Sequence, residues 1–477
     1  MSSYAKKPAS AFRLSPVLTS FLQHDGLPFA EILSAEDIHE AFDAGDAAFA
    51  KDQEDAVYTP EVTLWAFLSQ VLFKEEHRSC LAAVSRVMVL VVALGRPACT
   101  KNTGAYCRAR IKIPTSVIRR LATQTADGAE QHLPGEWLWR GRHVKLVDGF
   151  TVSMPDTEAN QQEYPQANTQ EPGLGFPIAR CVVLLSLATG MAADLEIGPY
   201  SGKETGETAL LRAMLERLQD GDIVLADRHY CSYFMIALLR ALGVDFVVRL
   251  HQCRTADFAR GRRLGKHDHI VRWSRPDQPE WMDDATYATM PATITVREIL
   301  VQVNQPGFRT ESFVVVTTLL DAEEYTVEDL SELYRKRWLV ELDIRVIKST
   351  LGFDILRCRT PEMVRKELWT ALLAYNLIRQ TMLQAAAEED CSPRELSFTL
   401  ALQTIGASWG VVVALSGEIQ IVLMDASLAG LADQRIGDRP DRTEPRKIKR
   451  RPKPHKLLTK PRAEARAELL RGAERDY

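Results

Sequence analysis

Residues 334–348 read Tyr-Arg-Lys-Arg-Trp-Leu-Val-Glu-Leu-Asp-Ile-Arg-Val-Ile-Lys, and no other stretch is as informative about the fold. A helix turns by about 100° per residue, so it places Tyr334, Arg337, Glu341 and Lys348 at roughly 0°, −60°, −20° and −40°. Arg345, a third cation, lies at roughly +20° on the same side. A carboxylate among cations, beside an aromatic ring, is what metal-assisted cutting of a phosphate backbone requires.

The residues around this stripe predict a helix. Thr326 can cap its N-terminus, Glu328 and Asp329 suit the positive end of the helix dipole, and Gly352 can end it. Apolar residues flank the stripe, so we expect the helix to be wedged into a core with its charged side at a cleft. The flanking residues are Leu333, Val340, Ile344 and Leu351 on one side and Trp338, Leu342 and Val346 on the other. A solvated face with ion pairs at i,i+4 spacing is the alternative.

The spacing Tyr-x2-Arg-x3-Glu-x6-Lys resembles the signature of bacterial insertion-sequence transposases of the DDE type, specifically the insertion-sequence-four family. The resemblance covers roughly residues 60–385. Three further stretches are similar to that family: Ser201–Glu207, Leu333–Trp338 and Leu372–Asn376. The resemblance implies two aspartates upstream of Glu341, each on a strand of an RNase H-like fold.

The chain has both aspartates. Residues 143–148 read as a buried strand that ends in Asp148, and residues 222–226 read as another that leads to Asp227. Because side chains from separate strands gather at the edge of an α/β sheet, the two can converge with Glu341. Carboxylate oxygens suit Mg²⁺ or Mn²⁺, and two such ions about 3.5–4 Å apart can activate the attacking oxygen and stabilise the leaving one. Either aspartate alone could instead be a turn residue at a strand end.

The implied fold class is α/β: an RNase H-like catalytic domain with a β-rich insertion, a helical N-terminal domain and a helical C-terminal region. The implied function is a DNA transposase that cuts and joins DNA at the ends of its own mobile element. Asp148, Asp227 and Glu341 would hold two Mg²⁺ or Mn²⁺ ions. Of the other stripe residues, Arg337 and Lys348 would bind phosphates beside the cut, and Tyr334 would support a phosphate or stack near the terminal nucleotide. A homodimer is expected in the DNA complex, because two ends must be cut and joined together.

Changes in composition divide the chain. We expect a loose arm at 1–27, a helical, DNA-end-binding region at 28–130, the first part of the core at 142–250, a β-rich insertion at 251–312, the second part at 313–390, a C-terminal region at 391–436 and a basic, disordered tail at 437–477. The polar stretch 156–177 is predicted as a loop, and residues 411–424 fit a strand pair or a helix.

Bulk properties are those of a globular protein, with 46% hydrophobic and 26% charged residues among 477. The apolar runs are too short to span a bilayer and no signal peptide is evident, so a cytoplasmic, nucleoid-associated bacterial protein is expected. No two of the eight cysteines have C-x2-C spacing, which argues against a zinc site.

The net charge of −4 is unevenly distributed. Residues 442–462 hold ten Lys or Arg and one acid, whereas residues 31–56 hold nine acids and one Lys. This segregation favours a polyanion partner. A second basic stretch, residues 101–114, is a candidate for DNA-end recognition through Arg108, Arg110 and Lys112. A structural helix bundle with a solvated basic face is the alternative for that stretch.

Three other functions stay open at this point. They are a different RNase H-like nuclease, a catalytically inactive DNA-binding protein derived from a transposase, and a helical protein–protein scaffold that uses the acidic segment. For His229, close after Asp227, a structural role is favoured over a catalytic one. For Trp273 and Trp281 of the insertion, core packing is favoured over stacking on a flipped base.

Overall fold

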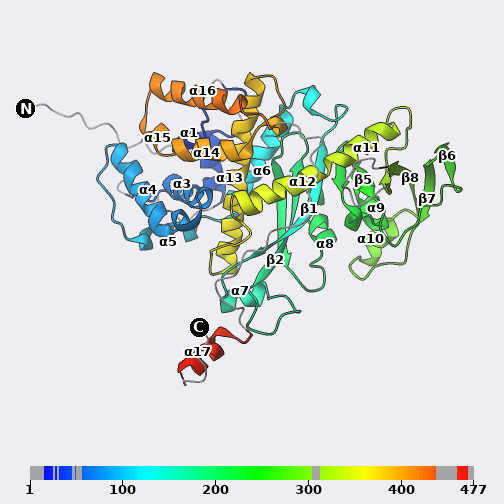
Figure 1. Cartoon of the computed structure of the whole chain (residues 1–477), viewed down its shortest axis with the longest axis horizontal. Helices are drawn as coiled ribbons and strands as arrows, with labels where there is room; N and C mark the ends of the chain where they lie inside the picture. Colours follow the sequence, from blue (N-terminus) through cyan, green and yellow to red (C-terminus); the bar gives the residue numbers. More distant parts are fainter. Residues whose placement is uncertain are drawn as a thin grey trace, which may run out of the picture.

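One sheet runs through the molecule. The computed structural model describes residues 15–24, 27–29, 32–45, 49, 56–302, 312–436 and 459–470. Within them nine strands form a single sheet with the order β3-β2-β1-β4-β5-β9-β8-β7-β6. Figure 1 shows a helical body at one end of this sheet and its last strands at the other.

The first five strands are β1 (Val144–Ser153), β2 (Ile178–Ser186), β3 (Ala192–Pro199), β4 (Ile223–Ala226) and β5 (Asp245–Arg249). β1, β2 and β3 pair antiparallel, whereas β4 and β5 lie parallel to β1 and to each other. Every residue of β4 is buried, as is typical of a strand covered by helices on both faces. The covering helices are α8 (Glu207–Arg212) and α9 (Tyr233–Ala241) on one face, and α6 (Thr115–Gln131), α12 (Trp338–Arg345) and α13 (Pro361–Glu388) on the other.

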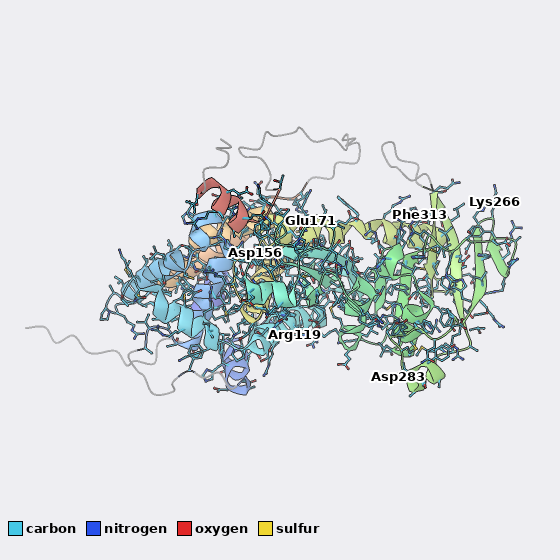
Figure 2. The ribbon with its side chains drawn as sticks, turned by 90° about the horizontal axis from the view of Figure 1, so that it is seen from below. Arg119, Asp156, Glu171, Lys266, Asp283 and Phe313 are labelled. Carbon is cyan, nitrogen blue, oxygen red and sulfur yellow. The ribbon has the colours of Figure 1, made fainter. Side chains whose placement is uncertain are left out.

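The strands of the insertion, and β9 that follows it, continue the same sheet. They are β6 (Arg262–Gly265), β7 (Asp268–Ser274), β8 (Thr293–Gln302) and β9 (Ser312–Thr317), with α10 (Asp284–Thr289) between β7 and β8. All pair antiparallel, and β9 also pairs with β5. A buried ion pair joins β7 to β8, with Arg297 Nη2 2.7 Å from Asp268 Oδ2. Lys266, in the β6–β7 turn, lies at the opposite end of the molecule from the helical body (Figure 2).

The helical body contains helices from both ends of the chain, packed on α13. Its other members are α1 (Ser15–Ser20), α2 (Ala35–Ala44), α3 (Pro60–Leu72), α4 (Cys80–Ala93), α5 (Thr103–Lys112), α6, α14 (Phe398–Ser408), α15 (Val411–Ala414) and α16 (Glu418–Ala432). Trp65 Nε1 donates to Ser20 Oγ, which donates to the carbonyl of Trp409. The helices before and after the sheet therefore form one body.

The structure differs from the prediction in two segments, one near the N-terminus and one in the sheet. The predicted loose arm contains α1, because Val17 and Phe21 are buried in the hydrophobic core. β1 does not end at Asp148, because the residues from Gly149 to Ser153 continue to pair with β2.

Further differences lie in the predicted loop and the predicted tail. α7 (Glu158–Glu163), capped by Thr157, lies inside the predicted loop 156–177. For residues 411–424, where a strand pair or a helix was expected, the helical alternative is confirmed by α15 and α16. Part of the predicted disordered tail forms α17 (Arg462–Leu470), and residues 437–458 and 471–477 lie outside the described residues. In the described part of the chain, no helix is both long enough and apolar enough to cross a bilayer.

Candidate active site

The signature stretch is helical, in three consecutive segments. α11 (Val327–Lys336) is followed by α12 after a single residue, Arg337, which itself has helical dihedral angles. Thr326 and Asp329 form the predicted N-terminal cap, here a reciprocal capping box. The last segment, Val346–Thr350, is a π-helix. Its turn is wider than that of the single regular helix that the sequence predicts.

A cluster of buried ion pairs around Asp343 holds α12 in place. The carboxylate of Asp343, which is 2% exposed, accepts hydrogen bonds from Arg379 of α13 and from Arg394, the latter at 2.6 Å. Arg394 also donates to the carbonyls of Leu187 and Ser186, next to β2. The helix that carries Glu341 is therefore held to both the helical body and the sheet.

Strand register brings the two aspartates together. β1 and β4 are parallel, and their pairing ends with Leu146 opposite Leu225. Continuing that register by two residues places Asp148 opposite Asp227. β4 ends at Ala226 while β1 runs on to Ser153. Within the described residues, the edge of β1 from Gly149 to Val152 therefore has no paired strand on the β4 side, and Ser153 forms a single bridge with Ile355.

Arg337 links the third acid to this edge. Its Nη2 lies 2.5 Å from Glu341 Oε1, and its Nη1 lies 3.8 Å from Asp148 Oδ2. The guanidinium therefore stands between the strand acid and the helix acid.

A groove of about 460 Å³ runs along the open edge of β1. Its lining residues come from β1, β2, the segment after β3, α8, α12 and the π-helix. They are Asp148, Gly149, Phe150, Thr151, Arg180, Tyr200, Glu207, Glu341, Ile344 and Lys348. Lys348 therefore reaches the same groove as Glu341, despite the π-helix between them. Glu207 is a fourth acid near the site, and the sequence alone assigned it no role. Its signal was its place at the end of Ser201–Glu207, one of the stretches similar to the family.

The electrostatics of the groove favour a cation. The pKa of Asp148 is raised to about 6, mainly by burial and also by the charges of Asp227 and Glu207, while the Gly149 N–H and Arg337 oppose this shift. Burial lowers the pKa of Arg337, but its contacts with Glu341, Tyr334 and Asp148 outweigh burial and raise it overall. The site thus holds more negative charge than Arg337 alone can offset.

The donor set fits a hard divalent cation. The groove is lined by carboxylates, with no imidazole or thiol among its lining residues. Among the described residues, no three His, Cys, Asp or Glu side chains are close enough to one another to share an ion. Glu341, which is held by Arg337, would have to turn toward the aspartates.

The remaining stripe residues have different environments. Tyr334 is 8% exposed and packs against Phe313, with ring centroids 5.1 Å apart. Burial raises its pKa to about 12. Its ring is therefore covered, which leaves little room for stacking on a nucleotide. Arg345 is exposed. Trp338, expected in the apolar flank, is 54% exposed directly after Arg337.

The basic residues of α5 also differ from one another. Arg110 is turned inward: it donates to Gln70 Oε1 at 2.8 Å and lies over the rings of Phe67 and Tyr106. Its guanidinium is thus engaged within the helical body, and we do not retain it among the expected phosphate contacts. Arg108 and Lys112 are exposed.

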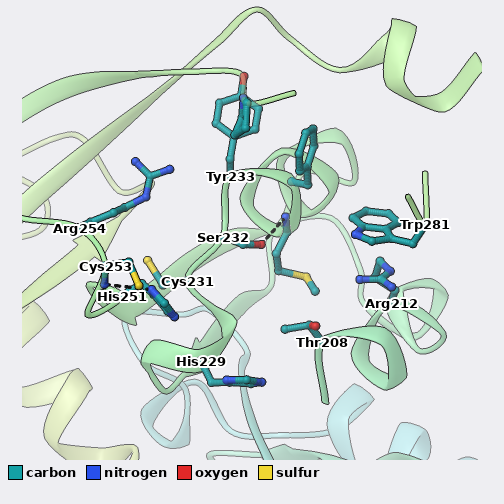
Figure 3. A pocket seen from close by; sticks show the side chains of 13 residues that line it. Thr208, Arg212, His229, Cys231, Ser232, Tyr233, His251, Cys253, Arg254 and Trp281 are labelled. Carbon is teal, nitrogen blue, oxygen red and sulfur yellow. Dashed lines mark hydrogen bonds between the residues drawn. The ribbon is translucent and has the colours of Figure 1, made fainter. Parts of the chain in front are cut away.

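A second cavity, of about 720 Å³, is lined in part by Thr208 and His229, which follow Glu207 and Asp227 closely in the sequence. Figure 3 shows Arg212 and Trp281 on one side of it and Arg254 on the other. The Arg212 guanidinium lies 3.7 Å from the centroid of the Trp281 ring. His229 also lines this cavity, and none of its lining residues is an acid. Trp273 is 7% exposed and its Nε1 donates to Glu298, so that tryptophan belongs to the core.

Comparisons with known proteins point to one family. Residues 139–377 match the family model of the transposase DDE domain. The transposase InsG of the insertion sequence element IS4, from Escherichia coli strain K12, is 26% identical over 401 residues, which cover 82% of this chain and 85% of that relative. The transposase of the element IS421 of Escherichia coli is 38% identical over 65 residues, 14% of this chain and 18% of that relative. Among solved structures, a piggyBac transposase synaptic complex with hairpin DNA aligns with 90% of this chain and 88% of its own, with a TM-score of 0.43 and 9% identity.

The matched domain spans half of the sequence, and the chain belongs to the DDE transposase family, in its insertion-sequence-four branch. It is therefore a DNA transposase, an enzyme that cuts DNA and transfers its strands. The predictions of the family, of the function and of DNA as the partner are confirmed.

Proposed function

We propose that this transposase cuts and joins DNA at the ends of its own mobile element in the groove along β1, with Asp148, Asp227 and Glu341 as its catalytic carboxylates. The observation that carries the proposal is the position of Arg337 between the acid of β1 and the acid of α12. The strand register, which puts Asp227 beside Asp148, supports it.

An RNase H-like core accounts for the first five strands. Three antiparallel strands followed by two strands parallel to the first make up the order β3-β2-β1-β4-β5. We take residues 142–250 and 313–390 as the two parts of this core and residues 251–312 as its insertion. The helical regions at 28–130 and 391–436 would then serve DNA-end binding and support.

The three carboxylates would hold two Mg²⁺ or Mn²⁺ ions. When bound, such ions supply Lewis-acid activation of the attacking oxygen and stabilisation of the leaving oxygen. The chain contributes acids that are partly withdrawn from water, which strengthens their attraction for a cation. Arg337 balances the charges of Asp148 and Glu341 until the site is filled, and can then turn its guanidinium to a phosphate.

Cationic and aromatic side chains around the acids would bind the DNA. Lys348 lines the groove itself, as a point charge for a phosphate. Arg254 and Trp281 line the neighbouring cavity, where a cation and a ring suit the phosphate and the base of a nucleotide. Tyr334, buried beside Arg337, would position that guanidinium. The exposed Arg345, Arg108 and Lys112 would add contacts to the backbone.

The DNA complex would be a homodimer. Each chain carries one set of catalytic acids, and a mobile element has two ends that must be cut and joined in a coordinated way. Two chains would supply two such sites.

The test is cleavage of labelled element-end DNA by the purified chain with Mg²⁺ or Mn²⁺, with the end sequence taken from the DNA that flanks the gene. Glu341→Gln should abolish cleavage while DNA binding persists. The matched control is Glu332→Gln, because Glu332 lies on α11, is 70% exposed and pairs only with Lys336 at 3.5 Å. Full cleavage by the Glu341 variant would refute the assignment. DNA binding without cleavage in either protein would identify an inactive, DNA-binding relative of a transposase.

A further inference from the structure

Glu207 lies in direct contact with the backbone next to Asp148. It opens α8, in the segment that follows β3. A Cβ atom placed on Gly149 would lie 2.3 Å from Glu207 Cδ and 2.6 Å from its Oε1. Any larger residue at position 149 would push the Glu207 carboxylate away. The glycine after Asp148 therefore makes room for a fourth acid.

Glu207 approaches the site from the opposite face of the sheet to Glu341. Side chains alternate along β1, with Leu146 and Phe150 in the hydrophobic cluster that includes α12, and Val147 in the cluster that includes α8. The open edge of β1 beyond the end of β4 lets acids from both faces line one groove.

A hydrogen bond fixes the Glu207 carboxylate close to Asp227. Tyr230 Oη donates to Glu207 Oε2 at 3.3 Å, and Tyr230 is fully buried three residues after Asp227. The bond therefore brings the Glu207 carboxylate to the short helical turn that follows Asp227.

Glu207 has no cationic partner within the described parts of the chain. Arg337 serves Glu341 and Asp148. Arg180, the guanidinium of the groove lining, donates to the carbonyl of Thr205 at 3.0 Å. A half-buried carboxylate beside two others needs a positive charge from another source.

We propose that Glu207 is a fourth carboxylate of the active site, and that it binds a divalent cation together with Asp148 and Asp227. Because no three such side chains among the described residues are close enough to share an ion, these side chains would turn toward one another when the cation binds. The inference rests on the proposed function, because it assumes that those two aspartates hold Mg²⁺ or Mn²⁺. The acids would then number four, one of them from the face of the sheet that carries α8.

Binding of Mn²⁺ to the full chain, followed through the electron paramagnetic resonance signal of free Mn²⁺, tests this without reference to activity. Glu207→Gln should weaken Mn²⁺ binding about tenfold or remove one bound ion. Glutamine keeps an acceptor for Tyr230, so a merely structural role would leave binding unchanged. Glu204→Gln is the matched control, since Glu204 lies three residues earlier and pairs with Arg212.

A second variant tests the contact itself. Gly149→Ala removes no charge but displaces the Glu207 carboxylate, and it should weaken Mn²⁺ binding in the same direction. Melting curves without metal would check that each variant is folded. If Glu207→Gln is not folded, Glu207→Asp would replace it.

Asp148→Asn separates this inference from the proposed function. If Asp148→Asn loses Mn²⁺ binding and Glu207→Gln retains it at wild-type affinity, the fourth carboxylate is refuted and the proposed site stands. If neither change alters binding, or if the wild-type chain binds no Mn²⁺, the proposed metal site fails and the inference with it. Weakened binding in both, with Glu204→Gln unchanged, supports both.

Discussion

At the scale of single residues, the site is organised by charge. Asp148, Asp227, Glu207 and Glu341 are gathered around one strand edge, and Arg337 is the cation that contacts two of them. Burial makes each uncompensated charge costly. The metal-free site should therefore be a source of instability as well as of chemistry.

Asp148→Asn should stabilise the metal-free protein. Because burial raises the pKa of Asp148 from 3.8 to about 6, the folded chain holds this proton more tightly than the unfolded chain. Stability should thus fall as the pH rises from about 4 through about 6, and the full cost should be present above that range. We expect a gain on the order of 1–3 kcal/mol at pH 7.5 that disappears near pH 4.

Urea denaturation at both pH values would measure this gain. Asp156→Asn, which changes an exposed carboxylate outside the groove, is the control. An equal gain at pH 4 and pH 7.5 would contradict the explanation through Asp148.

Trp338→Ala should weaken DNA binding without weakening the fold. The indole is 54% exposed directly after Arg337, so its removal costs little packing. Aromatic stacking on a base is worth about 1–3 kcal/mol, which corresponds to a loss of affinity of roughly tenfold or more. Fluorescence anisotropy with labelled element-end DNA would measure the loss, and Leu81→Ala, at another exposed apolar residue, should change nothing. An unchanged affinity for Trp338→Ala would remove this indole from the DNA surface.

At the scale of elements, α12 is positioned by its buried side. Asp343 is held by Arg379 and Arg394, which come from different segments of the chain. Glu341, which we propose as a catalytic acid, lies two residues away on the exposed side of the same helix. Its position therefore depends on contacts that never touch the groove.

Asp343→Ala should destabilise the protein by about 3–5 kcal/mol, because it leaves two buried guanidinium groups without their carboxylate. Glu332→Gln on α11 should cost less than about 1 kcal/mol, because its ion pair is exposed. Chemical denaturation of both variants would measure the difference. Similar stabilities for the two would show that the buried cluster contributes little.

The elements that could be predicted from sequence are those with long, uniform patterns. The Val- and Leu-rich runs 143–148 and 222–226 predicted strands, and the stretch capped by Thr326 predicted a helix, at nearly the observed positions. The extension of β1 past Asp148 was missed because it depends on pairing with β2. The π-helix at Lys348 and the inward turn of Arg110 were missed for the same reason, since both are set by tertiary contacts.

At the scale of the whole molecule, the acidic and basic charges of the chain are separated. The described body carries the acids of the site, and residues 442–462 carry ten Lys or Arg and one acid. Non-specific attraction for DNA should therefore depend strongly on this segment.

Deleting residues 437–477 should weaken binding to non-specific DNA and reduce its salt dependence. Each phosphate that the protein no longer neutralises lowers the slope of log K against log salt by about 0.9, so a segment that binds several phosphates should change the slope by several units. Affinity titrations across a range of salt concentrations would measure the slope, and the melting temperature should change little. A slope equal to that of the full chain would place the main phosphate-binding residues elsewhere, for example at Arg108 and Lys112.

The continuous sheet also constrains how such a chain can be shortened. β9 covers the side of β5 that would otherwise be open, and β8, β7 and β6 extend the sheet from there. Removing the insertion together with β9 would leave Val247 and Val248 on an unprotected edge strand, and such edges recruit strands from other chains. β9 therefore protects the edge of β5 from aggregation, and a minimal version of this enzyme would have to keep β9 or replace it.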